Sequence, residues 1–419
     1  MKMNETPSAN RVHIAFFGRR NAGKSSLVNA ITGQNLALVS DVKGTTTDPV
    51  YKAMELLPLG PVVIIDTPGF DDEGELGELR VQRARQVLNK IDIAVLALDA
   101  SSSSDWFFHP AEEELINFFR EKNIPYITVL NKCDLNDENS SETFSGEILP
   151  VSAKTGVNIN LLKEKIAALA SGEKPKLRLV ADIIQNRTHV QSDTGGDSPP
   201  LDFVVLVIPI DKAAPKGRLI LPQQQVIRDI LEAGGVTIAV KESELRETLN
   251  SLGKKPSLVI TDSQVFAEVA TIVPQEIPLT SFSILFARFK GFLETAVRGA
   301  STLDNLHSGD KILICEGCTH HRQCDDIGTV KIPRMIKKHA SIEPESCFCS
   351  GGDFPQDLSS YRLVIHCGAC MLNEREMQYR RVQAETQNIP FTNYGIAIAH
   401  IQGILKRSIA MFNAGTGNG

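Results

Sequence analysis

Residues 18–25 read Gly-Arg-Arg-Asn-Ala-Gly-Lys-Ser, a complete G-x-x-x-x-G-K-S phosphate loop. An apolar, β-rich run at 12–17 precedes the loop, and residues 26–31 after it have the composition of a helix start. Glycines let the backbone fold closely around phosphate oxygens, and a helix N-terminus offers free N–H groups and a partial positive charge. Because strand, loop and helix follow in this order, the sequence predicts a P-loop nucleotide-binding domain rather than a chance glycine-rich turn.

The loop predicts a contact for each of its polar side chains. We expect Lys24 to reach the β- and γ-phosphates and the Ser25 hydroxyl to ligate Mg²⁺. The other loop residues that would line the nucleotide are Gly18, Asn21, Ala22, Gly23 and Ser26.

Two further motifs are typical of the switch regions of a GTPase. In Gly44-Thr45-Thr46-Thr47-Asp48 we expect Thr46 to meet Mg²⁺ and the γ-phosphate, with Thr45 and Thr47 as register alternatives. An apolar strand at 61–65 ends in Asp66-Thr67-Pro68-Gly69. Asp66 would hold Mg²⁺ through water, and the Gly69 N–H would sense the γ-phosphate. The candidate catalytic residues are Lys24, Thr46 and Gly69.

Guanine specificity is indicated by two later motifs. A strand at 127–130 runs into Asn131-Lys132-Cys133-Asp134. The Asp134 carboxylate can accept from guanine N1–H and the N2 amine, which adenine cannot offer. Ser152-Ala153-Lys154 would then pack on the base. Four motifs in order behind a phosphate loop predict a P-loop GTPase binding GTP and GDP.

Two positions refine the predicted hydrolysis. Phe70 stands where Ras-like enzymes place a water-orienting glutamine, so we expect slow turnover. Asn21 stands where TrmE/Era-like GTPases hold K⁺, and a cation there would replace an arginine finger. The alternative is that Asn21 only caps the loop.

Composition limits the class of protein. The 419 residues allow roughly two to four domains, and the net charge of −6 argues against a nucleic-acid partner. We find neither a secretory segment nor an apolar run that would span a membrane, and so expect a cytoplasmic protein. Seven of the eight cysteines lie at 315–370, which favours metal binding over disulfides.

The chain is predicted to be α/β with three domains: a P-loop GTPase at 1–172, a small parallel α/β unit at 173–272 and a cluster-binding α/β domain at 273–419. The middle unit alternates strands with helices and shows no catalytic constellation, so we interpret it as a spacer or dimerisation module. Asp211, Lys212, Lys216 and Arg218 there are interpreted as a solvated loop rather than a phosphate patch.

In the last third, cysteines follow two predicted strands. The strand at 311–314 leads into Cys315 and Cys318, and the strand at 362–365 leads into His366, Cys367 and Cys370. Thiolates at the carboxyl ends of adjacent strands suit an iron–sulfur cluster or zinc. A closed zinc site of the four C-x-x-C thiolates is the alternative, although residues 318 and 367 are farther apart than the roughly 15–20 residues usual in such sites.

Here the chain resembles a known family. Cys318-Thr319-His320, followed by His366-Cys367-Gly368-Ala369-Cys370, is similar to the C-x-H … H-C-x-x-C signature of HydF, the family of GTPases that mature iron–iron hydrogenases. The switch I residues 44–49 match this family too. The separation of His320 and His366 lies at the short edge of the spacing found in the family.

The resemblance implies that Cys318, Cys367 and Cys370 hold a 4Fe–4S cluster with one exchangeable iron. Asp325 is the candidate fourth ligand, with Cys324, His320, His366 or an exogenous group as competitors. Cys315, Cys347 and Cys349 receive no role.

The resemblance also implies a function: a homodimeric GTPase and scaffold that assembles a di-iron subcluster precursor and transfers it to apo-hydrogenase, with radical-SAM hydrogenase maturases as further partners. Two alternatives stay open. One is a ribosome- or tRNA-associated GTPase with a four-cysteine zinc domain, and the other a non-enzymatic metallochaperone with a vestigial nucleotide site.

Overall fold

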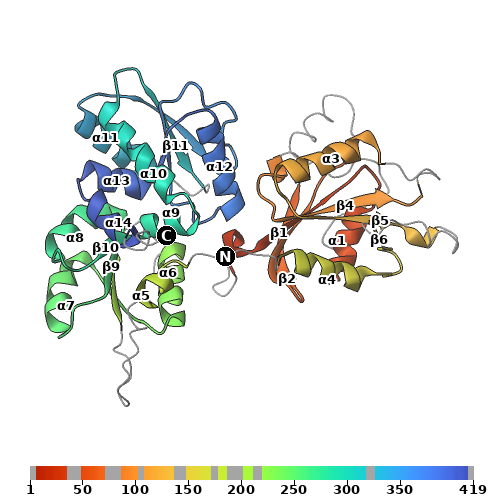
Figure 1. Ribbon diagram of the computed structural model, residues 1–419, viewed down its shortest axis with the longest axis horizontal. Helices are drawn as coiled ribbons and strands as arrows, with labels where there is room; N and C mark the ends of the chain where they lie inside the picture. Colours follow the sequence, from red (N-terminus) through yellow and green to blue (C-terminus); the bar gives the residue numbers. More distant parts are fainter. Residues whose placement is uncertain are drawn as a thin grey trace, which may run out of the picture. The chain divides into compact units, whose positions relative to one another are not determined.

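The computed structural model describes residues 6–34, 49–70, 86–101, 108–135, 148–170, 178–185, 202–210, 219–317 and 326–413. The chain divides into two compact units, Met1–Lys174 and Pro175–Gly419. Figure 1 shows the first unit in red to yellow and the second in yellow-green to blue. Within the described residues, none of the helices has the length and apolarity needed to span a bilayer.

The first unit is a six-stranded sheet with helices on both faces. Its strand order is β2-β3-β1-β4-β5-β6, parallel except for β2. The elements are η1 (Ser8–Asn10), β1 (Val12–Phe17), α1 (Lys24–Thr32), β2 (Val50–Leu56), β3 (Gly60–Asp66), β4 (Ile93–Asp99), α3 (Pro110–Glu121), β5 (Tyr126–Asn131), η2 (Cys133–Leu135), β6 (Ile148–Pro150) and α4 (Ile159–Ala170).

The two faces of this sheet are both buried, which explains the nearly continuous apolar strands. Helices α1 and α4 cover one face and α3 the other (Figure 1). Strand β1 lies between β3 and β4, so the chain crosses to opposite sides of it. In such sheets the ligand crevice lies outside the carboxyl ends of the strands at this switch point, where the phosphate loop follows β1.

The second unit contains two four-stranded sheets, with orders β10-β9-β7-β8 and β12-β11-β13-β14. The elements around the first are α5 (Ala181–Gln185), β7 (Phe203–Val207), α6 (Leu221–Glu232), β8 (Val236–Val240), η4 (Glu242–Glu244), α7 (Leu245–Ser251), β9 (Leu258–Thr261), η5 (Ser263–Val265), α8 (Phe266–Ile272), β10 (Leu279–Ser281) and α9 (Phe282–Phe289). Those around the other are α10 (Leu293–Ala300), η6 (Ser301–Asn305), β11 (Lys311–Glu316), η7 (Ile327–Lys331), α11 (Ile332–Ala340), β12 (Glu345–Ser350), β13 (Leu363–His366), α12 (Glu374–Thr386), β14 (Phe391–Asn393), α13 (Tyr394–Ile401) and α14 (Leu405–Asn413).

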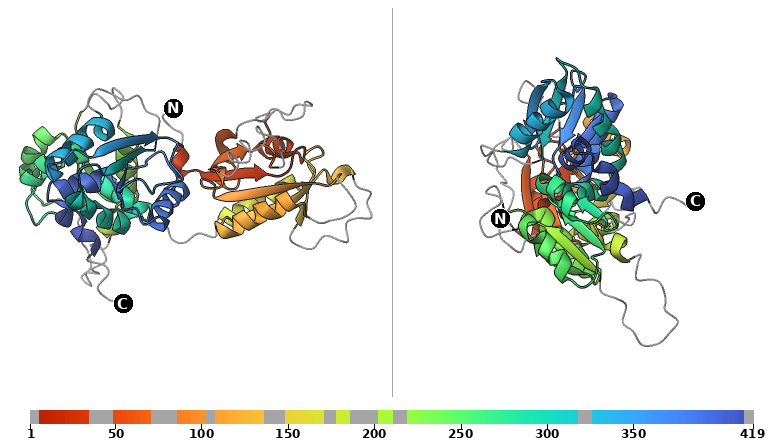
Figure 2. Two further views of the ribbon diagram at one scale, coloured as in Figure 1. Left: turned by 90° about the horizontal axis from the view of Figure 1, so that it is seen from above. Right: turned by 90° about the vertical axis from the view of Figure 1, so that its left-hand side faces the viewer.

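Both sheets of the second unit are entirely parallel, and they share a hydrophobic core. The green part of the chain at 203–281 and the blue part at 311–413 lie against each other in Figures 1 and 2. The last helix, α14, returns to the first of the two sheets, where Arg407 donates to the carbonyls of Ala270 and Val273.

Several elements differ from the sequence expectation. Strand β10 joins the middle sheet although it lies beyond residue 272, because it pairs with β9. Helices α9 and α10 are separate because the chain turns between them at Gly291, which has φ +71°. Strand β12 was not predicted, since its Glu, Ser and Cys residues carry no strand signal. Helix α12 is rich in charged residues, yet one face of it buries Met377 and Arg380.

Candidate functional site

The phosphate loop joins the carboxyl end of β1 to α1. Its residues Gly18, Asn21 and Gly23 have φ values of +145°, +63° and +81°. A Cβ at Gly18 would collide with the Ala97 carbonyl, and one at Gly23 with the Asn131 side chain. Both positions therefore require glycine, and the backbone is free to wrap a phosphate group.

Lys24, Ser25 and Asp66 meet at the base of this loop. Lys24 Nζ donates to the Gly18 and Arg19 carbonyls at 2.9 and 2.8 Å, which holds it over the loop. Ser25 Oγ donates to Asp66 Oδ2 at 2.6 Å. Burial raises the pKa of Asp66, and the Ser25 hydrogen bond and Lys24 charge oppose the rise.

The other carboxylate oxygen of Asp66, Oδ1, is buried and accepts no hydrogen bond from the described residues. An orphaned buried oxygen is costly unless a ligand or water satisfies it. Mg²⁺ prefers hard oxygen ligands and keeps several waters. The Ser25–Asp66 pair therefore fits a hydrated Mg²⁺ ion.

The segment after β3 is anchored to β1. Thr67 Oγ1 donates to the Phe16 carbonyl at 2.6 Å, which fixes the chain just before Gly69. Phe70 is 5% exposed and packs in the core with Phe17 and Ile65. The side chain after Gly69 thus serves packing, in line with the expectation that it orients no water.

The residues predicted to read guanine form a connected group. Asn131 Nδ2 donates to the Ala22 carbonyl at 3.0 Å, and its Oδ1 accepts from Ala153 N–H at 3.1 Å. Lys132 Nζ pairs with Asp99 at 2.6 Å. Asn131 therefore ties the phosphate loop to the loop around Ala153.

Asp134 is the residue of this group that the sequence predicts to read the base. Its Oδ1 accepts from Ser152 Oγ at 2.6 Å, and Ser152 is fully buried. Asp134 itself is exposed, as is Lys154. The buried Ser152 hydroxyl thus orients the Asp134 carboxylate, which remains accessible to solvent. This arrangement suits two hydrogen bonds to guanine.

Some of the predicted site residues are not among the residues that the structure describes. The following lie outside the described residues: Thr45, Thr46, Thr47, Cys318, His320, Cys324 and Asp325, together with the loop residues Asp211, Lys212, Lys216 and Arg218.

The second candidate site lies where β11 and β13 end side by side. Cys367 N–H donates to the Cys315 carbonyl at 2.8 Å, and Gly317 N–H donates to Cys367 Sγ at 3.1 Å. Ala369, at φ +54°, donates its N–H to the same sulfur at 3.3 Å. Two N–H donors favour the thiolate, so Cys367 fits a cluster-bound sulfur, with Cys370 on the same turn.

Topology marks the same place. From β11 the chain goes first to β12 on one side and then to β13 on the other. The carboxyl ends of β11 and β13 therefore form a topological switch point, which is where α/β sheets bind ligands.

Lys290 is a site residue that sequence reasoning missed. It is 3% exposed and donates to the Leu372 carbonyl at 2.7 Å and to the Ala369 carbonyl. Burial lowers the pKa of Lys290 to about 8, and negative charge on the Cys370 and Cys367 sulfurs opposes that shift. It is therefore still cationic at neutral pH. Its charge opposes the burial that raises the pKa of Cys370.

His366 is fully buried beneath the same turn. Arg380 can only donate, and its Nη1 lies 2.9 Å from His366 Nε2, so Nε2 accepts. Nδ1 therefore carries the proton and donates to the Cys367 carbonyl at 3.0 Å. Both ring nitrogens are engaged, which argues against His366 as the fourth ligand and makes it a support for Cys367.

Arg380 was also missed. Its side chain is 1% exposed and further donates to Glu376 at 2.6 Å and to the Gly351 carbonyl at 2.5 Å. The only sequence signal for Lys290 and Arg380 is a cation within a stretch that otherwise follows a helix pattern, which is equally typical of a surface.

The Cys315 side chain lies on the opposite face of the sheet from that of Cys367. Side chains alternate across a strand, and Cys315 packs in the core of one face while Cys367 packs against the core of the other. Cys315 Sγ lies 2.9 Å from Cys349 Sγ. Burial raises the pKa of Cys315 well above its ordinary value. This arrangement does not support a zinc site that includes Cys315.

Replacing Lys290 with Met should weaken the Cys367–Cys370 turn. The Ala369 and Leu372 carbonyls lose their donor, and loss of such a supporting residue typically lowers metal affinity about 10-fold or more. We expect reconstituted protein to release iron faster to a chelator. Lys255→Met, at an exposed lysine paired with Glu276, is the control and should match the wild type; equal release from all three proteins would contradict the role of Lys290.

His366 should make the second unit sensitive to acid. Burial and the Arg380 charge lower the pKa of His366 to about 3. The unfolded imidazole protonates below about pH 6.5, so protons favour unfolding between pH 6.5 and 3. From pH 7 to 5 this residue should remove about 2 kcal/mol of stability. Hydrogen exchange of peptides covering β13 would measure the loss, and His366→Gln should flatten the slope; an unchanged slope would refute it.

Three family profiles match the chain. The profile described as "50S ribosome-binding GTPase" matches residues 13–132. "Hydrogen maturase F dimerization domain" matches 195–291, and "Hydrogen maturase F tetramerization domain" matches 294–411.

Curated relatives resemble one part of the chain. The tRNA modification GTPase MnmE of Endomicrobium trichonymphae is 37% identical over 172 residues, covering 39% of this chain and 37% of that protein. MnmE of Streptococcus pyogenes serotype M12 (strain MGAS9429) is 30% identical over 177 residues, covering 42% and 37%. The chain therefore spans little more than a third of these relatives. Among solved structures, Aquifex aeolicus Era bound to GDP and AlF4 aligns with TM-score 0.33 and 22% identity, covering 59% of this chain and 91% of that one.

The profiles agree with the geometry. The first unit is a GTPase domain with the predicted α/β fold. The two later profiles together span 195–411 apart from two residues between them, and they include the sheet that carries Cys367 and Cys370. With both hydrogen maturase F domains present behind a GTPase domain, the chain belongs to the hydrogen maturase F (HydF) family.

Proposed function

We propose that the chain is a slow GTP hydrolase and an iron–sulfur scaffold that assembles the di-iron subcluster precursor and transfers it to apo-hydrogenase. One observation supports this: a GTPase domain, in which Ser152 orients Asp134, and a thiol-bearing turn inside a hydrogen maturase F domain occur in one chain. The Ser25–Asp66 pair would hold Mg²⁺ with Thr46.

Cys318, Cys367 and Cys370 would hold the 4Fe–4S cluster, with Asp325 as candidate fourth ligand. The cluster supplies an exchangeable iron when it is bound. The chain's own residues orient the sulfurs: Gly317 donates to Cys367 Sγ, and Lys290 holds the turn.

Anaerobic reconstitution with iron and sulfide tests the scaffold. We expect visible charge-transfer absorbance in the wild type and its loss in Cys318→Ala, Cys367→Ala and Cys370→Ala. Cys133→Ala, in the first unit, is the control. Activation of apo-hydrogenase should be lost in the same three variants; a colourless wild type that holds one zinc ion per chain would overturn the proposal.

Hydrolysis should be faster in K⁺ than in Na⁺. Asn21 is exposed on the phosphate loop at φ +63°, so its amide oxygen can reach a cation beside the phosphates. Asn21→Gly removes the side chain without backbone strain and should equalise the two rates. Asn123→Gly, at another left-handed asparagine, should keep the difference. Equal wild-type rates in both salts would contradict this role.

GTP would act on contacts with the maturases and hydrogenase rather than on iron chemistry, since none of the described residues around the cysteines forms a redox or methyl-transfer motif. Measured affinities for both partners should differ between GTP and GDP. If nucleotide leaves both affinities unchanged, this coupling fails.

The chain would work as a homodimer in the cytoplasm. The hydrogen maturase F profiles are those of dimerization and tetramerization domains. Strand β8 is an edge of the middle sheet and its residues are mostly half-buried, which suits pairing with a second copy. Light scattering before and after Ile238→Pro tests this edge.

A ribosome- or tRNA-associated GTPase remains the alternative. The relatives named for tRNA modification support it for the nucleotide domain alone. Binding of transfer RNA or ribosomes without iron–sulfur absorbance would favour it.

A further inference from the structure

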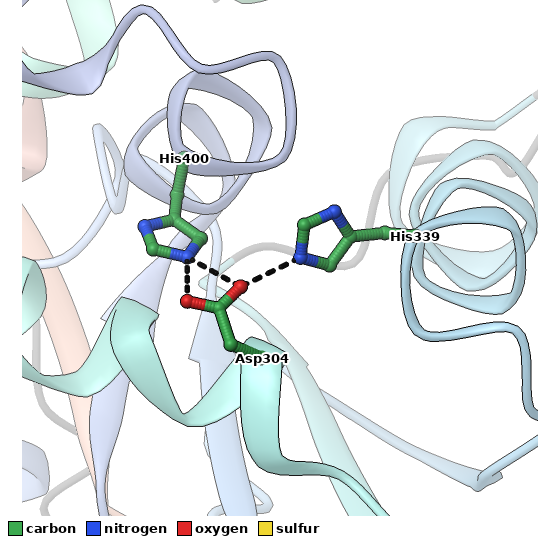
Figure 3. A group of neighbouring side chains, drawn as sticks. All are labelled: Asp304, His339 and His400. Atoms are coloured by element: carbon green, nitrogen blue, oxygen red, sulfur yellow. Dashed lines mark hydrogen bonds and ion pairs between the residues drawn. The ribbon is translucent and has the colours of Figure 1, made fainter.

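Three side chains from separate elements meet on the surface of the second unit: Asp304 of η6, His339 of α11 and His400 of α13 (Figure 3). His339 Nε2 lies 2.8 Å from Asp304 Oδ1. His400 Nε2 lies 3.0 and 2.9 Å from the two oxygens of Asp304. The three candidate ligand atoms all lie within 4.8 Å of one another.

This group lies at the opposite end of the strands of the last sheet from Cys367 and Cys370. Helix α11 runs back from the carboxyl edge, and its end at His339 leads into the start of β12. Helix α13 likewise follows β14 and has His400 in its last turn, while Asp304 precedes β11. All three residues therefore lie near the amino ends of the strands, whereas Cys367 follows the carboxyl end of β13.

The environment favours a cation. His339 and His400 stand in the last turns of their helices, where the helix dipole is negative. Asp304 adds a carboxylate whose side chain is 50% exposed, and the imidazoles are 25% and 20% exposed. Nearby Lys337 is engaged by Glu343 at 2.6 Å. The site is thus open to an ion from solvent on one side and supported by packed helices on the other.

The donor set matches a borderline transition metal. Two imidazole nitrogens and one carboxylate oxygen are typical of zinc and iron(II) sites with open positions. Tetrahedral Zn²⁺ with ligands at about 2.0–2.1 Å needs donors about 3.3 Å apart. The present separations of 2.8–3.0 Å require the side chains to move outward by a few tenths of an ångström, which exposed termini permit.

We propose that Asp304, His339 and His400 form a second metal site, which binds a divalent first-row transition ion, Zn²⁺ as its reference occupant, with water completing the coordination. The ion replaces the hydrogen bonds from the imidazoles to Asp304. The ion links η6, α11 and α13 near the amino ends of the strands, at the opposite end from Cys367 and Cys370. This site does not depend on the iron–sulfur proposal.

Cobalt titration of the reconstituted full-length protein tests the site. Co²⁺ bound here should give visible d–d bands without the thiolate charge-transfer band of a cysteine site. Zn²⁺ should displace it and raise the unfolding temperature. His339→Ala, His400→Ala and Asp304→Asn should each weaken binding by about 100-fold or more, since even supporting residues contribute 10–100-fold.

Two controls isolate the site. His307→Ala changes a histidine of the same domain that lies near Asp310, and it should bind Co²⁺ as the wild type does. Cys367→Ala should lose the cluster but keep the cobalt bands. The proposal is overturned if the wild type and the three site variants bind equal amounts of Co²⁺ with equal spectra. It is also overturned if the variants change the unfolding temperature equally with and without Zn²⁺, because the group is then only an ion-pair clasp.

Discussion

Asp134→Asn should reverse the base preference of the nucleotide pocket. The carboxylate accepts from guanine N1–H and the N2 amine, whereas an asparagine presents an NH₂ group to the same donors. Losing two charge-assisted hydrogen bonds of about 1.5–3 kcal/mol each predicts GTP binding weaker by about 10²–10⁴-fold. Xanthosine triphosphate carries a carbonyl at the amine position, so the variant should prefer it. Calorimetry with both nucleotides measures the switch.

Asp92→Asn is the matched control for this change. Asp92 accepts from His13 N–H at 2.8 Å, at the amino edge of the sheet. It lies just before β4, at the amino end of the strands, whereas the phosphate loop lies at their carboxyl end. Its variant should therefore bind GTP normally. Ser152→Ala should have a smaller effect than Asp134→Asn, because it removes only the orienting hydrogen bond. An Asp134→Asn protein with unchanged GTP affinity would exclude this residue from base recognition.

Arg380→Met should strongly destabilise the second unit. The substitution removes the cation beside the buried Glu376 and the donors to His366 and Gly351. Truncating one side of a buried ion pair costs about 3–5 kcal/mol. Denaturant unfolding should show this loss, and iron retention should fall because His366 is no longer fixed under Cys367.

The neighbour Arg381 provides the control. Arg381 pairs with Glu385 at 2.5 Å on the outer side of α12 and is more exposed, so Arg381→Met should cost less than about 1 kcal/mol. Adding Glu376→Gln to Arg380→Met should recover part of the loss, since it removes the uncompensated charge. Equal costs for the two arginines would show that the buried pair contributes little.

The GTPase half could be predicted because its chemistry is local. A phosphate loop needs glycines at positive φ within a few residues of one strand end, and both Gly18 and Gly23 have that geometry. Asp66 and Asn131 follow apolar strands whose carboxyl ends must meet in a parallel sheet. The order of the motifs along the chain therefore predicted where their side chains lie in the fold. Thr46 lies outside the described residues.

The thiol site could be predicted only in part. The sequence patterns predicted that strands β11 and β13 lie next to each other. They did not predict Lys290, which contacts Ala369 only because the two sheets pack together. The unpredicted strand β12 turned Cys315 toward Cys349. The sequence alone does not distinguish a buried charged residue from an exposed one, because it does not show which partner the charge contacts.

The sequence by itself determined the nucleotide chemistry, the parallel α/β class and the family of this protein, since each rests on short motifs or on strand and helix periodicity. The tertiary structure alone decided which side chains support Cys367, which face Cys315 occupies and that Asp304, His339 and His400 meet. Those outcomes depend on contacts between residues 14 to 96 positions apart, and only the packed chain sets such distances.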